Sequence, residues 1–251
     1  MQHTLCAVFV AVSLSAAGAQ PVVPPAPSSP KPELSPEMRG DIYMARKMYR
    51  EAIDTFRSAN RKDPVLLNKT GIAYHQMMQF DNARKSDEEA LRYKKDYVEA
   101  MNNLGTVYYA RKNFRRAISW YNRALTLAPN ESKSASIYMN LGTAHFARKK
   151  YEDATQAYQT AMQLDPDVFE RHGNFGVMLE ERTVEERAKY HFYLAKLYAK
   201  GGRNELAIQY LRKSIEEGLR DKAKMLADPE FAALKELPEF KLLLTLEPRV
   251  L

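Results

Sequence analysis

Small and aromatic residues recur in the middle of the chain with the spacing of amphipathic helices. One stretch carries Leu104, Gly105, Tyr108, Phe114, Ala117, Tyr121, Ala124 and Pro129, and the same order returns 37 residues later at Leu141, Gly142, His145, Tyr151, Ala154, Tyr158, Ala161 and Pro166. Intervals of three and four residues place such side chains on one face of a helix. A proline cannot continue a helix and therefore ends each unit. The pattern predicts two repeated units, each a pair of helices.

Related units precede and follow these two. The first carries Gly40, Tyr43, Tyr49, Ala52, Phe56, Ala59 and Pro64, the second carries Gly71, Tyr74, Phe80, Ala83 and Ala90, and the fifth carries Leu194, Ala195, Tyr198, Ala207 and Leu211. In the second unit Asp87 stands where the first, third and fourth have an aromatic residue. The fifth follows a capping box that runs from Thr183 to Glu186. Because neither helix of a unit can bury its apolar stripe alone, we expect the units to stack.

This pattern closely resembles the tetratricopeptide repeat, whose small and aromatic signature residues occupy these spacings in a unit of about 34 residues. The resemblance covers about residues 35–217 and implies an all-α fold, a right-handed α-solenoid of about five helical hairpins. Beyond it, Pro229 and Pro238 stand at expected first positions of short helices that would cap the stack. The expected segments are a signal peptide over 1–19, a proline-rich linker over 20–35, repeats one to four over 36–168, an irregular insertion over 169–182, a fifth repeat over 183–217 and capping helices over 218–251.

The first twenty residues predict export. They contain no Asp, Glu, Lys or Arg, and a short apolar run gives way to small residues that end at Ala19. This is typical of a secretory signal peptide cut after Ala19, which would leave a periplasmic or secreted protein. The absence of a Lys or Arg at the start leaves two alternatives, a leader retained in the membrane or a start further upstream. Cleavage would also remove Cys6, the only cysteine, which suits an oxidising compartment.

Composition narrows the function further. The chain is 45% apolar and 27% charged, with a mean hydropathy of −0.51, which excludes a polytopic membrane protein. The net charge of +7 favours an anionic partner without naming one. His75, His145, His172 and His191 form no metal-binding or catalytic spacing, so we expect no enzyme activity, no metal and no cofactor. Export and the lack of a nucleic-acid-reading module disfavour nucleic acid as a partner.

In the family that the chain resembles, the first helix of each unit lines a concave groove. Asn103 and Asn140 precede their signature glycines by two residues and resemble the asparagine ladders with which some repeat proteins hold an extended peptide. An amide donates and accepts hydrogen bonds, as a peptide main chain requires. The alternative is a surface asparagine that bonds locally, or, for Tyr109 and Phe146, burial between helices. The candidate groove residues are Asn68, Lys69, Ile72, His75, Asn102, Asn103, Thr106, Tyr109, Asn140, Thr143 and Phe146.

Basic residues recur at the turns between the two helices of a unit. The residues of this predicted basic ridge are Arg46, Lys47, Arg111, Lys112, Arg148, Lys149 and Lys150. Such a ridge would dock an acidic protein or make peripheral contact with an anionic membrane surface. The alternative is that cations simply favour the last turn of a helix and its C-terminal dipole.

We therefore expect an exported scaffold that binds a protein or peptide partner in its groove, in a task such as envelope assembly. The alternative function is an electrostatic adaptor that docks on anionic surfaces or acidic proteins through the basic ridge.

Overall fold

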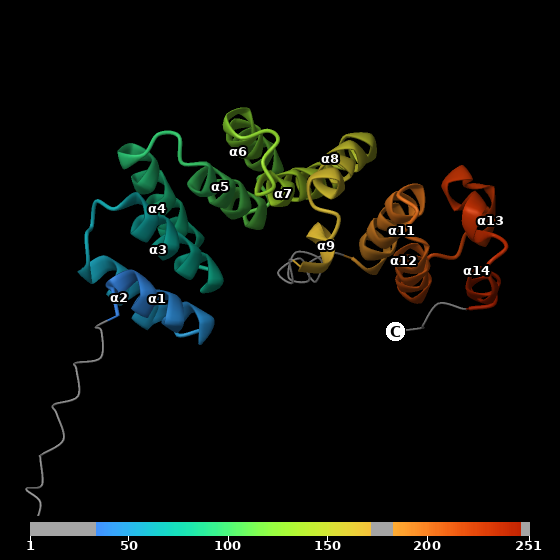
Figure 1. The fold of residues 1–251 in the computed structure, drawn as a ribbon, viewed down its shortest axis with the longest axis horizontal. Coiled ribbons are helices and arrows are strands. Elements are labelled where there is room, and N and C mark those ends of the chain that lie inside the picture. The colour runs from blue at the N-terminus through green and yellow to red at the C-terminus, as the bar shows by residue number, and fades with distance from the viewer. Residues whose placement is uncertain (1–33, 172–182, 247–251) are drawn as a thin grey trace, which may run out of the picture. The chain divides into compact units, whose positions relative to one another are not determined.

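The structure is a computed structural model that describes residues 34–171 and 183–246. The predicted signal peptide, the linker up to residue 33, most of the predicted insertion and the last five residues lie outside the described residues. From Ser35 onward the chain forms one compact unit. Every regular element in the described part is a helix (Figure 1).

The helices follow one another as hairpins, as the repeats predicted. The first helices are α1 (Pro36–Ala45), α3 (Pro64–Gln76), α5 (Val98–Ala110), α7 (Ser134–Ala147) and α11 (Val184–Lys200). Their second helices are α2 (Tyr49–Ser58), α4 (Phe80–Tyr93), α6 (Phe114–Leu127), α8 (Tyr151–Leu164) and α12 (Asn204–Glu216). Each first helix packs on its own second helix, and each second helix contacts the first helix of the next repeat. The all-α fold of stacked helical hairpins is thus confirmed.

Inside each hairpin the signature glycine lies against an aromatic ring of the second helix. A Cβ atom on Gly105 would lie 2.3 Å from Cε1 of Tyr121, and one on Gly142 would lie 2.5 Å from the Tyr158 ring. Both tyrosines are fully buried. Only glycine allows the two helices to approach this closely. The recurring glycine therefore sets the packing distance within a hairpin.

The turn inside each hairpin has a left-handed residue just after the first helix. These residues are Lys47, Met78, Lys112 and Lys149, with φ between 58° and 62°, and Gly202, with φ of 72°. A left-handed residue at this position closes a helix C-terminus and is usually glycine. Four of the five turns place a side chain there instead.

The carboxyl-terminal part contains the short helices α9 (Val168–Arg171), α13 (Lys222–Ala227), η1 (Pro229–Leu234) and α14 (Pro238–Leu243). The predicted irregular insertion began at residue 169, but residues 169–171 belong to helix α9. The rest of that segment, residues 172–182, lies outside the described residues. The capping box of α11 is present, with Thr183 and Glu186 in reciprocal hydrogen bonds. Helix η1 packs on α11 and α14 packs on α12, so the tail covers the last hairpin. Phe231 and Phe240 are fully buried in that contact.

Candidate functional site

Polar side chains connect consecutive first helices through one repeated contact. Nδ2 of Asn103 donates to Oδ1 of Asn68 at 2.7 Å, and Nδ2 of Asn140 donates to Oδ1 of Asn102 at 3.0 Å. In both pairs, a residue three before one signature glycine meets the residue two before the next. The same two positions carry an ion pair between α1 and α3, where Nζ of Lys69 lies 2.8 Å from Oε1 of Glu37. We call these three contacts the side-chain ladder.

The ladder leaves part of each amide for other partners. Asn102, Asn103 and Asn140 are half-buried, so water or a ligand reaches them. Within the ladder Asn103 and Asn140 each use one N–H, while an amide offers two N–H groups and a carbonyl oxygen that accepts twice. The asparagines therefore connect the repeats and still present hydrogen-bonding groups at the surface.

At its amino-terminal end the ladder is a charged cluster. Nζ of Lys69 contacts Glu37 and, at 2.6 Å, Oδ2 of Asp41. Burial alone would lower the pKa of Lys69, but the hydrogen bonds and charges of the two carboxylates outweigh it and raise this pKa. Two acidic groups share one lysine, so this end of the ladder is net negative.

Three of the predicted groove residues lie in the interior. The exposed fractions are 5% for Asn68, 1% for Thr143 and 4% for Phe146. The Thr143 hydroxyl donates to the Met139 carbonyl oxygen at 2.9 Å and lies 3.2 Å from the Tyr158 hydroxyl. Because neighbouring helices cover these side chains, we correct the prediction and exclude the three from the candidate surface.

The other predicted groove residues are half-buried and lie on the first helices. They are Lys69, Ile72, His75, Asn102, Asn103, Thr106, Tyr109 and Asn140. The Tyr109 ring packs against Phe114 at 5.2 Å between centroids, and the His75 ring packs edge-on against Phe80 at 5.4 Å. Burial lowers the pKa of His75, so its ring is neutral at pH 7. We call this set of eight residues the first-helix face.

The predicted basic ridge is exposed but uneven. Nη1 of Arg111 lies 2.5 Å from Oδ1 of Asp81, and Nζ of Lys150 lies 3.3 Å from Oδ2 of Asp153. Arg46, Lys47, Lys112 and Lys149 are exposed, and Arg148 is half-buried. The equivalent turn of the second repeat reads Met77, Met78 and Gln79 and has no cation. The positive electrostatic potential of the ridge is therefore weaker than that of a continuous row of cations, because two cations are paired with carboxylates and the second repeat contributes none.

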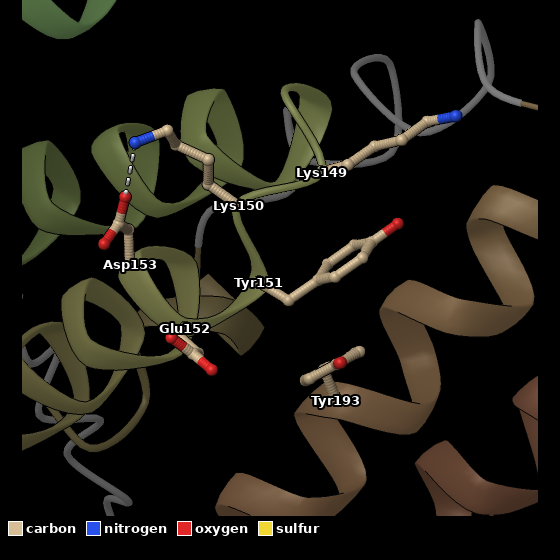
Figure 2. Close-up of a pocket in the computed structure, with 6 residues that line it drawn as sticks. All are labelled: Lys149, Lys150, Tyr151, Glu152, Asp153 and Tyr193. Carbon is tan, nitrogen blue, oxygen red and sulfur yellow. Dashed lines mark hydrogen bonds and ion pairs between the residues drawn. The ribbon is translucent and has the colours of Figure 1, made fainter.

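Sequence analysis missed a cavity beside the turn between α7 and α8. It has a volume of about 390 Å³, and Figure 2 shows Tyr151 from the start of α8 and Tyr193 from α11 beside it. Tyr193 stands two residues before Ala195, the place that Asn103 and Asn140 occupy before their glycines. Extending the repeat alignment to the fifth unit would have drawn attention to Tyr193.

The described residues hold no group of three or more His, Cys, Asp or Glu side chains that could bind a metal ion. None of the described helices combines the length and the apolar character needed to cross a bilayer.

Solved and curated proteins show similarity to parts of this chain. A thermophilic tetratricopeptide repeat protein of Thermus thermophilus is 16% identical, with 76% of this chain and 94% of that chain covered and a TM-score of 0.50. MamA of Desulfovibrio magneticus, residues 41 to the end, is 20% identical, with 71% and 90% covered and a TM-score of 0.48. The uncharacterized protein ycf37 of Pyropia yezoensis is 37% identical over 65 residues, which are 26% of this chain and 36% of that protein. The chain thus spans about a third of the length of this curated relative.

Family models give the clearest assignment. Models of the tetratricopeptide repeat match residues 64–130, 96–167 and 188–217, which together are more than half of the chain. These ranges contain the hairpins from α3 to α8 and most of the hairpin of α11 and α12. The chain therefore belongs to the tetratricopeptide repeat family.

Proposed function

We propose that this chain is a scaffold that binds a protein or peptide partner on its first-helix face. The observation that carries the proposal is the side-chain ladder, which connects α3, α5 and α7 through amide hydrogen bonds and leaves the half-buried amides of Asn102, Asn103 and Asn140 on α5 and α7. An extended peptide has a main-chain N–H and C=O at almost every residue, and a row of amides matches both. Binding of this kind depends little on the side chains of the partner.

Apolar groups on the same face would add affinity. Ile72 and Tyr109 are half-buried on α3 and α5, the helices that also carry Lys69, Asn102 and Asn103. Aromatic rings next to hydrogen-bonding groups are typical of surfaces that bind a partner segment, because apolar contact supplies affinity and polar contact supplies orientation. The first-helix face therefore favours an extended or amphipathic segment.

The proposed role is non-enzymatic. Tetratricopeptide repeat proteins are generally scaffolds without enzyme activity. The hydrogen-bonding groups that carry the proposal, Asn102, Asn103 and Asn140, are amides, which neither titrate near neutral pH nor act as strong nucleophiles. Recognition is the chemistry that such groups support best.

We further propose that the scaffold works outside the cytoplasm, in a task such as envelope assembly, after removal of residues 1–19. The support is the uncharged, apolar leader and its ending of small residues. The mass of the protein recovered from cells tests the cleavage: we expect a chain that begins at Gln20, and a full-length mass would contradict it.

An electrostatic adaptor that uses the basic ridge is the alternative function. Its support is the set of exposed cations at three turns. The gap at the second repeat and the ion pairs of Arg111 and Lys150 count against it. Replacing Arg46, Lys47 and Lys112 by Gln separates the two functions, because it should spare binding on the first-helix face and weaken docking through the ridge.

The main test replaces Asn103 and Asn140 by Ala together. A peptide selected from a random library against the unaltered protein serves as the probe, and its affinity is measured by fluorescence anisotropy. We expect the double variant to bind about tenfold more weakly or worse, because hydrogen bonds made at a central surface dominate affinity. Asn122→Ala, an exposed asparagine on α6, is the matched control and should leave the affinity unchanged.

Unfolding must be measured in parallel, because the substitution also removes the hydrogen-bond donor to buried Asn68. We expect a loss of about 1–3 kcal/mol in the free energy of unfolding, with the helical signal retained at the assay temperature. An unchanged affinity in a folded double variant would contradict binding on the first-helix face.

A further inference from the structure

A cavity of about 390 Å³ lies between the turn that joins α7 to α8 and the middle of α11. Its lining residues are Lys149, Lys150, Tyr151, Glu152, Asp153 and Tyr193 (Figure 2). The volume lies in the range of cavities that hold small ligands or single side chains.

Two cations beside the cavity are not neutralised within the described part of the chain. Lys150 is paired with Asp153, and Figure 2 shows the Lys149 side chain extending in the opposite direction from that pair. The Lys189 ammonium lies 4.0 Å from the centroid of the Tyr151 ring, a cation–π contact and not an ion pair. Among the lining residues, Lys149 and Lys150 are matched in number by Glu152 and Asp153, and Lys189 beside the Tyr151 ring adds one positive charge.

The aromatic wall of the cavity is held in place by packing. The rings of Tyr151 and Tyr193 are stacked, with 5.3 Å between centroids and 16° between planes. Both rings contact buried Phe146, at 5.1 Å and 5.9 Å between centroids. The wall is therefore formed before any ligand arrives, which lowers the entropic cost of binding.

The cavity joins the two surfaces that the sequence predicted separately. Lys149 and Lys150 belong to the basic ridge. Tyr193 holds in the fifth repeat the position that Asn103 and Asn140 hold in the third and fourth, and Lys189 lies one turn before it on α11. A segment that continues from the first-helix face toward the carboxyl-terminal repeats would meet this cavity.

We propose that the cavity receives an acidic side chain of the bound peptide, with the carboxylate near Lys149 and Lys189 and the aliphatic part against Tyr151 and Tyr193. The inference rests on the proposed function, because the rest of the peptide would lie on the first-helix face. Charge complementarity selects the carboxylate, and the stacked rings select a side chain with a short apolar stem. An anionic membrane fits less well, because it needs a flat array of cations and the ridge is interrupted at the second repeat.

A second cavity in the equivalent turn of the second repeat provides an internal comparison. It has about 420 Å³ and is lined by Met78, Gln79, Phe80, Asp81, Asn82 and Arg111. Its only lining cation, Arg111, is paired with Asp81 at 2.5 Å. This cavity has the size but not the free positive charge, so we do not expect it to take a carboxylate.

The test compares two double variants of the full chain that lose the same charge. Lys149→Gln with Lys189→Gln removes the two cavity lysines. Lys85→Gln with Lys95→Gln removes two exposed lysines that belong neither to the cavity nor to the basic ridge. The probes are array-printed hexaglutamate, hexaglutamine and hexalysine peptides, and vesicles of phosphatidylglycerol.

We expect hexaglutamate to bind the unaltered protein and to bind the cavity variant about tenfold more weakly or worse, with little change in the control variant. Replacing the two cavity lysines by Arg should retain binding. Equal weakening in both Gln variants would show unspecific attraction and overturn the inference. A membrane contact would replace the inference if the unaltered protein bound the vesicles but not hexaglutamate, and if the cavity variant no longer bound the vesicles.

These outcomes separate the inference from the proposed function. If hexaglutamine binds as well as hexaglutamate and the loss of Asn103 and Asn140 weakens both, the first-helix face stands and the cavity inference fails. If no peptide from the array or from the random library binds the unaltered protein, both fail.

Discussion

Asp87 is the residue at which this chain departs most from its own repeat. It lies in α4, fully buried, where Phe56, Tyr121 and Tyr158 stand in other hairpins. Neither carboxylate oxygen has a hydrogen-bond partner among the described residues. Burial, together with the charge of Glu88, raises the pKa of Asp87 well above its ordinary value of 3.8. A buried carboxyl group without a partner destabilises the fold when it is ionised.

The sign of the pH dependence follows from this raised pKa. Above pH 3.8 the folded state holds a proton on Asp87 that the unfolded state releases, so the free energy of unfolding falls as the pH rises toward the folded pKa. Asp87→Asn should remove this slope and raise the free energy of unfolding at pH 7 by about 1–3 kcal/mol. Urea unfolding between pH 4 and about pH 7 measures both effects. A free energy of unfolding that rises with pH in the unaltered protein, or a loss of stability at pH 7 in Asp87→Asn, would show that the carboxylate has a stabilising partner.

At the scale of the helical hairpin, the turns carry a cost that glycine would avoid. Lys47, Met78, Lys112 and Lys149 adopt a left-handed conformation that crowds a Cβ atom. The fifth hairpin has Gly202 at this place. The lysines at three of the turns therefore lower the free energy of unfolding relative to glycine. At Lys149, the proposed contact with a ligand carboxylate is a reason for a lysine to stand there.

Exchange of residues between two turns tests this cost. Lys112→Gly should raise the free energy of unfolding by about 0.5–1 kcal/mol, because relief of the left-handed strain outweighs the added freedom of the unfolded chain. Gly202→Lys should lower it by a similar amount. Thermal and urea unfolding of the two variants measure the change. A loss of stability in Lys112→Gly would mean that the lysine side chain makes a stabilising contact at the turn.

The elements were largely predictable from the sequence, because each depends on local spacing. Gly105 with Tyr121, and Gly142 with Tyr158, follow from helical periodicity and from the size of a ring. Helix α9 was not predicted, since a single turn of helix has no period to detect. The left-handed lysines were not predicted either, although Gly202 at the equivalent place marks the conformation.

At the scale of the whole molecule, contacts between repeats were the part that the sequence could not provide. Asn103 and Asn140 were identified from their place before the glycines, but their bonds to Asn68 and Asn102 depend on how far neighbouring first helices are offset. The burial of Phe146 has the same origin, because Tyr190 and Tyr193 of α11 cover it after a segment whose path no periodicity describes. The sequence thus predicted which types of residue form the candidate site, but not which of those side chains the neighbouring helices bury.

The most direct test of the account is where a bound peptide touches the protein. The photo-crosslinking residue p-benzoylphenylalanine replaces Tyr109 on α5 in one variant and Trp120 on α6 in another, both half-buried aromatic positions. Each variant is irradiated with the peptide selected from the random library, and the crosslinked product is measured by mass spectrometry. We predict a crosslink from position 109 and none from position 120. A crosslink from position 120 alone would contradict binding on the first-helix face.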